Sequence, residues 1–107
     1  MKKRIYSEFE LQAIAYCRLR TYYNDLVRGE YALRKLGSCL YLADLVILDK
    51  ETKEPFIIIE VKKNKKELEQ APAQIRAYQE FAPHVLTISS LYEAENIIIS
   101  ISKLAIS

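Results

Sequence analysis

Residues 39–62 read "CLYLADLVILDKETKEPFIIIEVK", two apolar segments separated by a short charged one. Each apolar segment has the length and the content of aliphatic and β-branched side chains that are typical of a strand. The charged segment "DKETKEP" between them is typical of a turn. The stretch therefore predicts a β-hairpin formed by residues 39–48 and 56–62. Each strand carries one acid inside its apolar run, Asp44 in the first and Glu60 in the second.

The pairing of this hairpin sets the distance between the two acids. If the strands pair around a turn centred on Thr52, Leu48 faces Phe56. Counting outward from that pair places Asp44 opposite Glu60. Directly opposite residues on neighbouring strands bring their Cβ atoms to about 4.5–5.5 Å. The sequence therefore predicts two carboxylates side by side on one face of a sheet.

Lys62 joins the same face as Glu60, because side chains alternate between the two faces of a strand. Two adjacent carboxylates repel each other, and a divalent cation relieves that repulsion: Mg²⁺ takes one or two carboxylates together with waters and phosphate oxygens. A cation at such a site polarises a phosphoryl oxygen and lowers the pKa of a water, and an ammonium nearby stabilises the developing charge. The pattern predicts phosphodiester hydrolysis. The residues expected on the opposite face are Ile57, Ile59 and Val61.

Before the hairpin, helical spacing begins at Ser7, which forms a capping-box pattern with Glu10. Gly29 is a typical helix stop, so the helix is expected to end there. Residues 30–36 are a weaker strand candidate, followed by a turn at Gly37. The apolar stripe of the helix consists of Leu11, Ile14, Ala15, Leu19, Tyr22 and Leu26.

After the hairpin, apolar residues at helical spacing predict a helix with Pro72 in its first turn and its end at Pro83. A strand over residues 85–89 follows, reached through that helix and so parallel to a neighbour. Ser90 and Glu93 then open a closing helix, although "IIISIS" has strand propensity as well. The order α-β-β-β-α-β-α predicts a single α/β domain over residues 1–107, with a mixed sheet of about four strands flanked by helices in three layers.

Composition limits the class of protein. Half of the 107 residues are hydrophobic and 28% are charged, with a net charge of +2, which is typical of a soluble globular domain. We expect a cytoplasmic protein without a membrane segment, because neither a signal peptide nor an apolar run of about 18 residues is present. Cys17 and Cys39 lack metal-type spacing and are expected to be buried or half-buried thiols. No glycine-rich phosphate loop is present, so no ATP-driven activity is expected.

Two motifs carry a family resemblance. Ala43-Asp44 with Glu60-Val61-Lys62 resembles the signature of the PD-(D/E)xK nuclease superfamily, with Ala43 where the family often has proline. Residues 74–78, "QIRAY", resemble the Q-x-x-x-Y motif of RecB-like nucleases and of the restriction subunit of type I restriction enzymes. In those proteins the motif lies on the helix that follows the E-x-K strand. The chain as a whole is similar to the N-terminal nuclease domain of the type I subunits.

The resemblance implies a restriction-endonuclease-like fold and Mg²⁺-dependent cleavage of DNA, with Mn²⁺ as a substitute. It implies that Asp44 and Glu60 bind the metal, that the Val61 carbonyl is a third ligand, and that Lys62 is catalytic. The residues expected to support the site or contact DNA are Gln74, Tyr78, Lys63, Lys65 and Lys66; a lysine run beside a metal site suits phosphate contacts.

The family often takes a further carboxylate from its first helix. Helical spacing places Glu8 near the middle of the apolar stripe and Glu10 well away from it. Glu8 is therefore the favoured metal ligand, and Glu30 stays open as an alternative.

Three other functions stay open at this point. The domain could be a catalytically inactive module for nucleic-acid binding or assembly. It could be a nuclease domain that acts only with a motor or restriction-modification partner chain. It could also be a nuclease resembling a Holliday-junction resolvase, for which a homodimer is expected.

Overall fold

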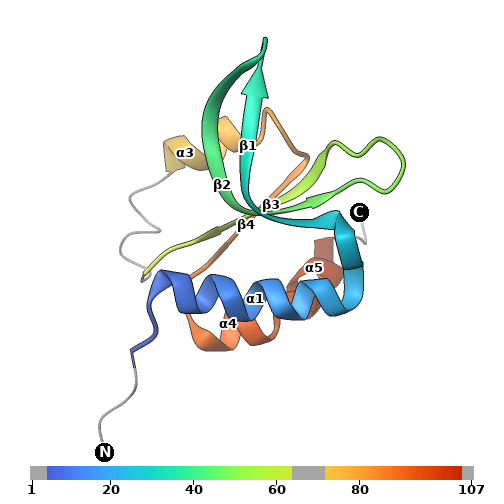
Figure 1. Ribbon diagram of the computed structural model, residues 1–107. Coiled ribbons are helices and arrows are strands. Elements are labelled where there is room, and N and C mark those ends of the chain that lie inside the picture. Colours follow the sequence, from blue (N-terminus) through green and yellow to red (C-terminus); the bar gives the residue numbers. More distant parts are fainter. Residues whose placement is uncertain (1–4, 64–71, 105–107) are drawn as a thin grey trace, which may run out of the picture.

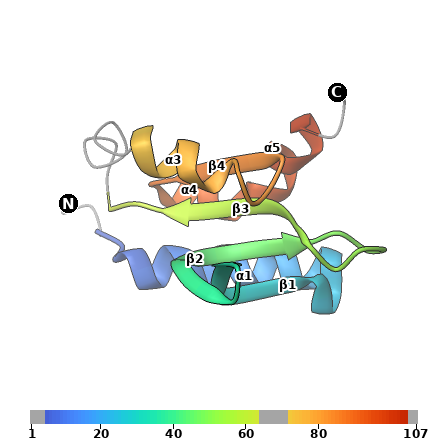
Figure 2. The same ribbon diagram turned by 90° about the horizontal axis from the view of Figure 1, so that it is seen from above.

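The computed structural model describes residues 5–63 and 72–104, which form a four-stranded mixed sheet with helices on both faces. The strands lie in the order β1-β2-β3-β4 and are seen side by side in Figure 2. This arrangement confirms the predicted α/β class and the predicted order of elements. The elements are α1 (Glu8–Tyr23), the 3₁₀ turn η1 (Asn24–Leu26), β1 (Val27–Lys35), β2 (Ser38–Leu48), β3 (Pro55–Val61), α3 (Pro72–Tyr78), β4 (His84–Ile88), α4 (Leu91–Glu95) and α5 (Ile97–Leu104).

Helices cover the two faces of the sheet unequally. In Figure 1, α1, α4 and α5 lie below the sheet and α3 lies above it. The lower face packs the larger apolar cluster, which includes Leu11 and Leu19 of α1 together with Ile59 of β3. The upper face packs a smaller cluster around Ile58 of β3 and Tyr78 of α3. The two clusters show why β3 reads as a continuous apolar run, since both of its faces are buried.

The predicted register of the central hairpin is confirmed over three pairs, Leu45–Ile59, Val46–Ile58 and Ile47–Ile57. The expected pair of Leu48 with Phe56 is wrong, because the register shifts between Ile47 and Leu48, and Leu48 pairs with Pro55. An extra residue in one strand causes such a shift at a bulge. The shift lies at the turn end of the hairpin, so it leaves the positions of the two acids unchanged. As predicted, β4 is parallel to its neighbour β3.

The first helix ends six residues earlier than the sequence predicts. It stops at Tyr23, and Asn24 adopts φ 56°, a conformation that asparagine tolerates better than most residues. Gly29 is therefore not a helix stop and lies within β1. Tyr22, which is expected in the apolar stripe of this helix, lies on the surface with 65% of its area exposed.

At one point along β1 and β2, the alternation of side chains between the lower and upper faces of the sheet shifts by one residue. On β1, Val27 belongs to the lower cluster and Leu33 to the upper one, although strict alternation would place them on the same face. On β2, Leu45 and Ala43 differ in the same way. The change occurs around Glu30, whose φ of 49° interrupts the extended backbone. Beyond this point the two strands leave the sheet as a projecting hairpin (Figure 1).

The C-terminal segment is helical, which settles the ambiguity of "IIISIS", but it forms two helices with a break at Asn96. The Ser90 side chain caps α4 by accepting a hydrogen bond from the Glu93 N–H at 3.2 Å. Cys17 and Cys39 are both exposed free thiols, so the expectation that they are buried is wrong. Among the helices that the structure describes, none has the length and apolar content needed to cross a membrane.

Candidate active site

Asp44 and Glu60 meet where the backbone pairing of β2 with β3 stops. The Asp44 N–H donates to Glu60 Oε1 at 3.1 Å, and the Val61 N–H donates to Asp44 Oδ2 at 2.8 Å. The regular ladder ends at the neighbouring pair Leu45–Ile59. Beyond that pair each carboxylate accepts a hydrogen bond from a backbone N–H of the neighbouring strand. The backbone therefore fixes both acids beside each other.

Among the described residues, Glu60 is the buried charged residue, with 5% of its surface exposed. Burial, and then the negative charge of Asp44, raise the pKa of Glu60 from its ordinary 4.5 to about 7. The Asp44 N–H, the Lys62 ammonium and a hydrogen bond from Tyr78 act in the opposite direction. The raised pKa means that the protein's own positive groups only partly compensate the charge of this acid pair.

A closed ring of contacts links the E-x-K strand to α3. Lys62 Nζ donates to Gln74 Oε1 at 2.9 Å, and Gln74 Nε2 donates to the Tyr78 hydroxyl at 3.1 Å. Tyr78 is hydrogen-bonded in turn to the Glu60 carboxylate. The ring closes through Lys62 Nζ, which lies 4.0 Å from Glu60 Oε2. These contacts orient the ammonium and the carboxylate relative to each other.

Helix α3 presents Gln74 and Tyr78 to the site from one face, since residues four apart are neighbours on a helix. Tyr78 is almost fully buried, and the Tyr41 ring of β2 packs against it edge to face at a centroid distance of 5.5 Å. Burial, and then the charge of Glu60, raise the pKa of the Tyr78 phenol. Tyr78 therefore stays neutral, and its hydroxyl can donate a hydrogen bond to the Glu60 carboxylate.

Helix α1 contributes Gln12 to the surroundings of the acids. Gln12 Nε2 donates to the backbone carbonyl of Asp44 at 3.2 Å and to Glu30 Oε1 at 3.0 Å. Sequence reasoning missed Gln12, although a polar residue at the edge of an apolar helical stripe can reach a neighbouring strand. Glu8, the favoured further carboxylate, is exposed in the first turn of the helix. Glu30, the alternative, is linked to the Asp44 carbonyl through the bridging Gln12.

The donor set fits a cation that needs few protein ligands. Within residues 5–63 and 72–104, no group of three or more Asp, Glu, His or Cys side chains is arranged to hold a metal ion. Neither Glu8 nor Glu30 therefore completes a three-acid set with Asp44 and Glu60. Mg²⁺ typically takes one or two carboxylates and completes its coordination with water and phosphate oxygens. The Val61 carbonyl opens on the Asp44 side of β3, because the two backbone polar groups of a strand residue point the same way.

Of the predicted lysines that follow Lys62, the structure describes Lys63. Lys63 is exposed and borders a cavity of about 540 Å³, whose lining includes Tyr6, Leu11 and Ser90 on the side of α1 and α4. Lys65 and Lys66 lie outside the described residues. Lys62, at the start of the run, contacts both Glu60 and Gln74.

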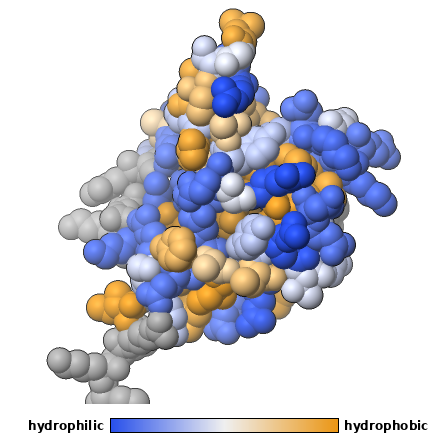
Figure 3. All heavy atoms as spheres, in the orientation of Figure 1, coloured by the Kyte–Doolittle hydropathy of each residue, from blue (hydrophilic) through white to orange (hydrophobic). Residues whose placement is uncertain are grey.

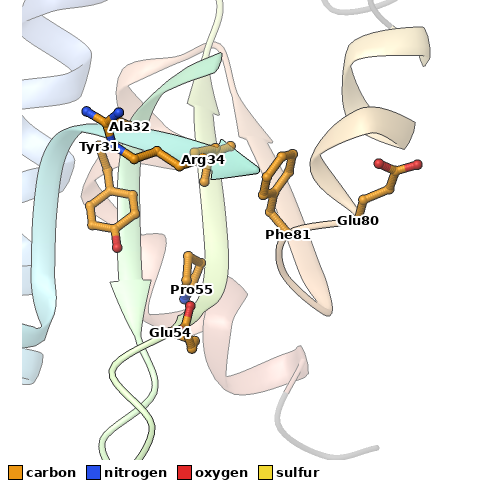
Figure 4. Close-up of a pocket in the computed structure, with 8 residues that line it drawn as sticks. Tyr31, Ala32, Arg34, Glu54, Pro55, Glu80 and Phe81 are labelled. Atoms are coloured by element: carbon orange, nitrogen blue, oxygen red, sulfur yellow. The ribbon is translucent and has the colours of Figure 1, made fainter. Parts of the chain in front are cut away.

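The cavity drawn in Figure 4 lies against β1 and does not include the acid pair. Its volume is about 480 Å³, and Tyr31 and Arg34 reach it from β1 while Phe81 reaches it from the segment after α3. Acidic and basic side chains both border it. The complete lining is Tyr31, Ala32, Leu33, Arg34, Glu54, Pro55, Glu80 and Phe81.

Comparison of the chain with models of known protein families, with curated proteins and with solved structures gives no match. The functional interpretation therefore depends on the geometry of the site and on the two sequence motifs.

Proposed function

We propose that this chain is a metal-dependent endonuclease that hydrolyses DNA phosphodiester bonds, with a core of the restriction-endonuclease type. The proposal includes the resemblance to the nuclease domain of type I restriction subunits. One observation carries it: Glu60 and Lys62 of the E-x-K motif join Gln74 and Tyr78 of the Q-x-x-x-Y motif in one ring of contacts, and Asp44 is attached to that ring through Glu60. A pair of surface charges on a strand would not need a buried tyrosine and a glutamine from another element to orient them.

Asp44 and Glu60, with the Val61 carbonyl, would hold Mg²⁺ or Mn²⁺. When bound, the cation would supply charge neutralisation at the phosphate and a lowered pKa for a nearby water. The chain's own contribution is to hold both carboxylates ready through backbone hydrogen bonds to Asp44 Oδ2 and Glu60 Oε1. Such preorganisation avoids rearrangement of the site during the reaction.

Lys62 is the catalytic residue in this proposal. Its ammonium would stabilise the negative charge that develops on the phosphate oxygens and orient the attacking water. Gln74 and Tyr78 are positioning residues: Gln74 holds Lys62 Nζ at 2.9 Å, and Tyr78 holds Gln74 and the Glu60 carboxylate. Removing the ammonium should lower the cleavage rate on the order of a hundredfold or more.

The test follows cleavage of supercoiled plasmid, single-stranded circle and a synthetic four-way junction with Mg²⁺, Mn²⁺ or EDTA. Lys62→Ala is compared with Lys50→Ala, whose lysine lies exposed in the β2–β3 turn. We expect metal-dependent cutting by the wild type and by Lys50→Ala, and its loss in Lys62→Ala. Equal cutting by all three proteins would point to a contaminating nuclease and contradict the proposal.

The same experiment separates the alternatives. Preference for the four-way junction by a dimer would identify a resolvase-like nuclease. Metal binding without cutting, lost in Asp44→Asn, would indicate a domain that requires a partner chain. Nucleic-acid binding that ignores both metal and Lys62→Ala would indicate an inactive module and overturn the proposal.

A further inference from the structure

The outer parts of β1 and β2 form an arm, which we define as residues 31–43. The arm projects beyond the sheet (Figure 1). β3 pairs with β2 only from Leu45 onward, so the register pairs of the arm join β1 to β2 alone. The base of the arm is covered, because Leu33 and Ala43 are buried in the upper cluster, whereas the leucines toward its tip are exposed. The apolar side chains at the tip of the arm therefore do not contribute to the packing of the core.

The tip of the arm is strained and apolar. Lys35 and Ser38 pair, and between them Leu36 has φ 53° and Gly37 has φ 82°. Both central residues of this two-residue turn have positive φ, the type I′ geometry that strongly favours Asn-Gly or Asp-Gly. For leucine the left-handed conformation costs roughly 1–2 kcal/mol. Leu36 is moreover 99% exposed, so it repays this strain with no apolar contact inside the protein.

Further apolar side chains follow on the same ribbon. Leu40 is 50% exposed and Leu42 is 54% exposed, although both lie within a strand. Figure 3 shows apolar atoms at the end of the arm with hydrophilic atoms directly beneath them. An exposed apolar group of this kind on a projecting ribbon marks a surface that meets a partner.

The charge of the arm favours a polyanion as that partner. Arg34 and Lys35 flank the tip, and residues 31–43 contain no aspartate or glutamate. Both basic residues are exposed. The arm thus combines cations with an apolar tip, and proteins that open a nucleic-acid groove use this combination: cations contact phosphates, and a leucine or similar side chain inserts between base steps. A two-stranded ribbon also has a suitable width for a groove of duplex DNA.

The base of the arm adjoins the candidate active site. Asp44 directly follows the arm in the sequence, and Tyr41 of the arm packs against the Tyr78 ring. At about 3.3 Å per residue, the six residues from Asp44 to Ser38 span about 20 Å. With base pairs spaced about 3.4 Å apart, the tip reaches about six base pairs from a phosphate held at the acids.

We propose that the arm is a nucleic-acid wedge, in which Arg34 and Lys35 bind backbone phosphates and Leu36 inserts between bases about six base pairs from the cleaved bond. This inference rests on the proposed nuclease function, since it describes how the DNA cleaved at the acid pair would also contact the arm. Binding is nevertheless measured separately from cleavage, so the two proposals can fail independently.

The first test uses Leu36→Asn. Asn-Gly suits the type I′ turn, so this variant should melt at a temperature equal to or above that of the wild type, which excludes unfolding as the cause of any loss. The probe is a DNA duplex that carries 2-aminopurine at successive positions, titrated in EDTA so that no cleavage occurs. We expect the wild type to raise the fluorescence at one unstacked position, and Leu36→Asn to abolish that rise and bind about tenfold more weakly, the effect of one lost apolar contact.

The second test removes the charges. Arg34→Gln with Lys35→Gln should reduce the slope of log affinity against log salt by about 1.8, about 0.9 for each lost phosphate contact. The matched control is Lys50→Gln with Lys53→Gln, which removes the same charge from the β2–β3 turn and should leave the slope nearly unchanged.

Specific outcomes would overturn the wedge. The wedge is wrong if Leu36→Asn matches the wild type in 2-aminopurine fluorescence and DNA affinity. It is also wrong if the control pair loses as much of the salt slope as Arg34→Gln with Lys35→Gln. Sedimentation of the free wild type as a dimer that Leu36→Asn converts to a monomer would identify a self-association surface instead. Binding through the arm without any metal-dependent cutting would contradict the nuclease function alone.

Discussion

At the scale of single residues, Asp44 and Glu60 each have two roles. Each carboxylate accepts a backbone N–H across the gap between β2 and β3, and the pair also presents negative charge to the site. The raised pKa of Glu60 is the measurable consequence of this crowding. Sequence reasoning could place the acids opposite each other by counting, but it could not find the hydrogen bonds, because these depend on where the ladder stops.

Glu60 gives a prediction for the pH dependence of stability in metal-free protein. Its pKa is raised from 4.5 to about 7 in the folded state, so the folded protein binds the proton more strongly than the unfolded chain. The contribution of Glu60 to the free energy of unfolding is therefore largest below about pH 4.5 and is lost as the pH rises through about 7, by up to about 3 kcal/mol in total.

The measurement is urea unfolding in EDTA between about pH 5 and about pH 8.5. Glu60→Gln keeps an oxygen for the Asp44 N–H and removes the titration, so its unfolding free energy should fall less steeply with rising pH than that of the wild type. Parallel curves for the two proteins would show that Glu60 titrates normally in the folded state.

At the scale of elements, the predictable parts are those that local pattern decides. The strands of the central hairpin follow from their apolar runs, and α3 follows from Pro72 and its spacing. The end of α1 cannot be predicted in this way, because Gly29 carries the stronger helix-stop signal in the sequence, whereas Asn24 adopts the positive φ in the structure. The exchange of faces near Glu30 is not predictable either, because it depends on the backbone conformation of that one residue, whose φ is 49°.

The two glycines test this account of the elements. Gly29 lies in β1 without a positive φ, and a Cβ there would meet the Asp44 carbonyl at 4.0 Å, an ordinary contact. Gly29→Ala should therefore raise the free energy of unfolding by about 0.5–1 kcal/mol. Gly37 has φ 82° in the turn of the arm, so Gly37→Ala should lower it by about 1 kcal/mol. Thermal melting of both variants checks the opposite signs, and destabilisation by Gly29→Ala would contradict this account of Gly29.

At the scale of the whole molecule, the sheet brings together residues that are far apart in the sequence. Gln12 of α1, Asp44 of β2, Glu60 of β3 and Gln74 of α3 all contribute to one region. A cation bound there would contact groups that exist together only in the folded chain. Its binding should therefore stabilise the entire domain.

We expect Mg²⁺ or Mn²⁺ to raise the melting temperature of the wild type. At a hundred times its dissociation constant, a ligand that binds only the folded state adds about 2.7 kcal/mol. The rise should be larger at about pH 8 than at about pH 6, because protons compete for Glu60 below its raised pKa. Asp44→Asn should abolish the rise, whereas Glu30→Gln should retain most of it. A rise that persists in Asp44→Asn would place the cation elsewhere.

The hydrogen bonds that fix the two acids have a consequence for how such a chain diverges over time. Under the proposed nuclease function, a descendant that no longer cleaved DNA would still need Asp44 and Glu60 to keep the outer ends of β2 and β3 together. The Lys62 side chain does not hold the two strands together, so Lys62 would be the first of the three residues to be substituted. Among relatives of this protein, the lysine would then distinguish active nucleases from inactive ones, while both kinds would retain the acids.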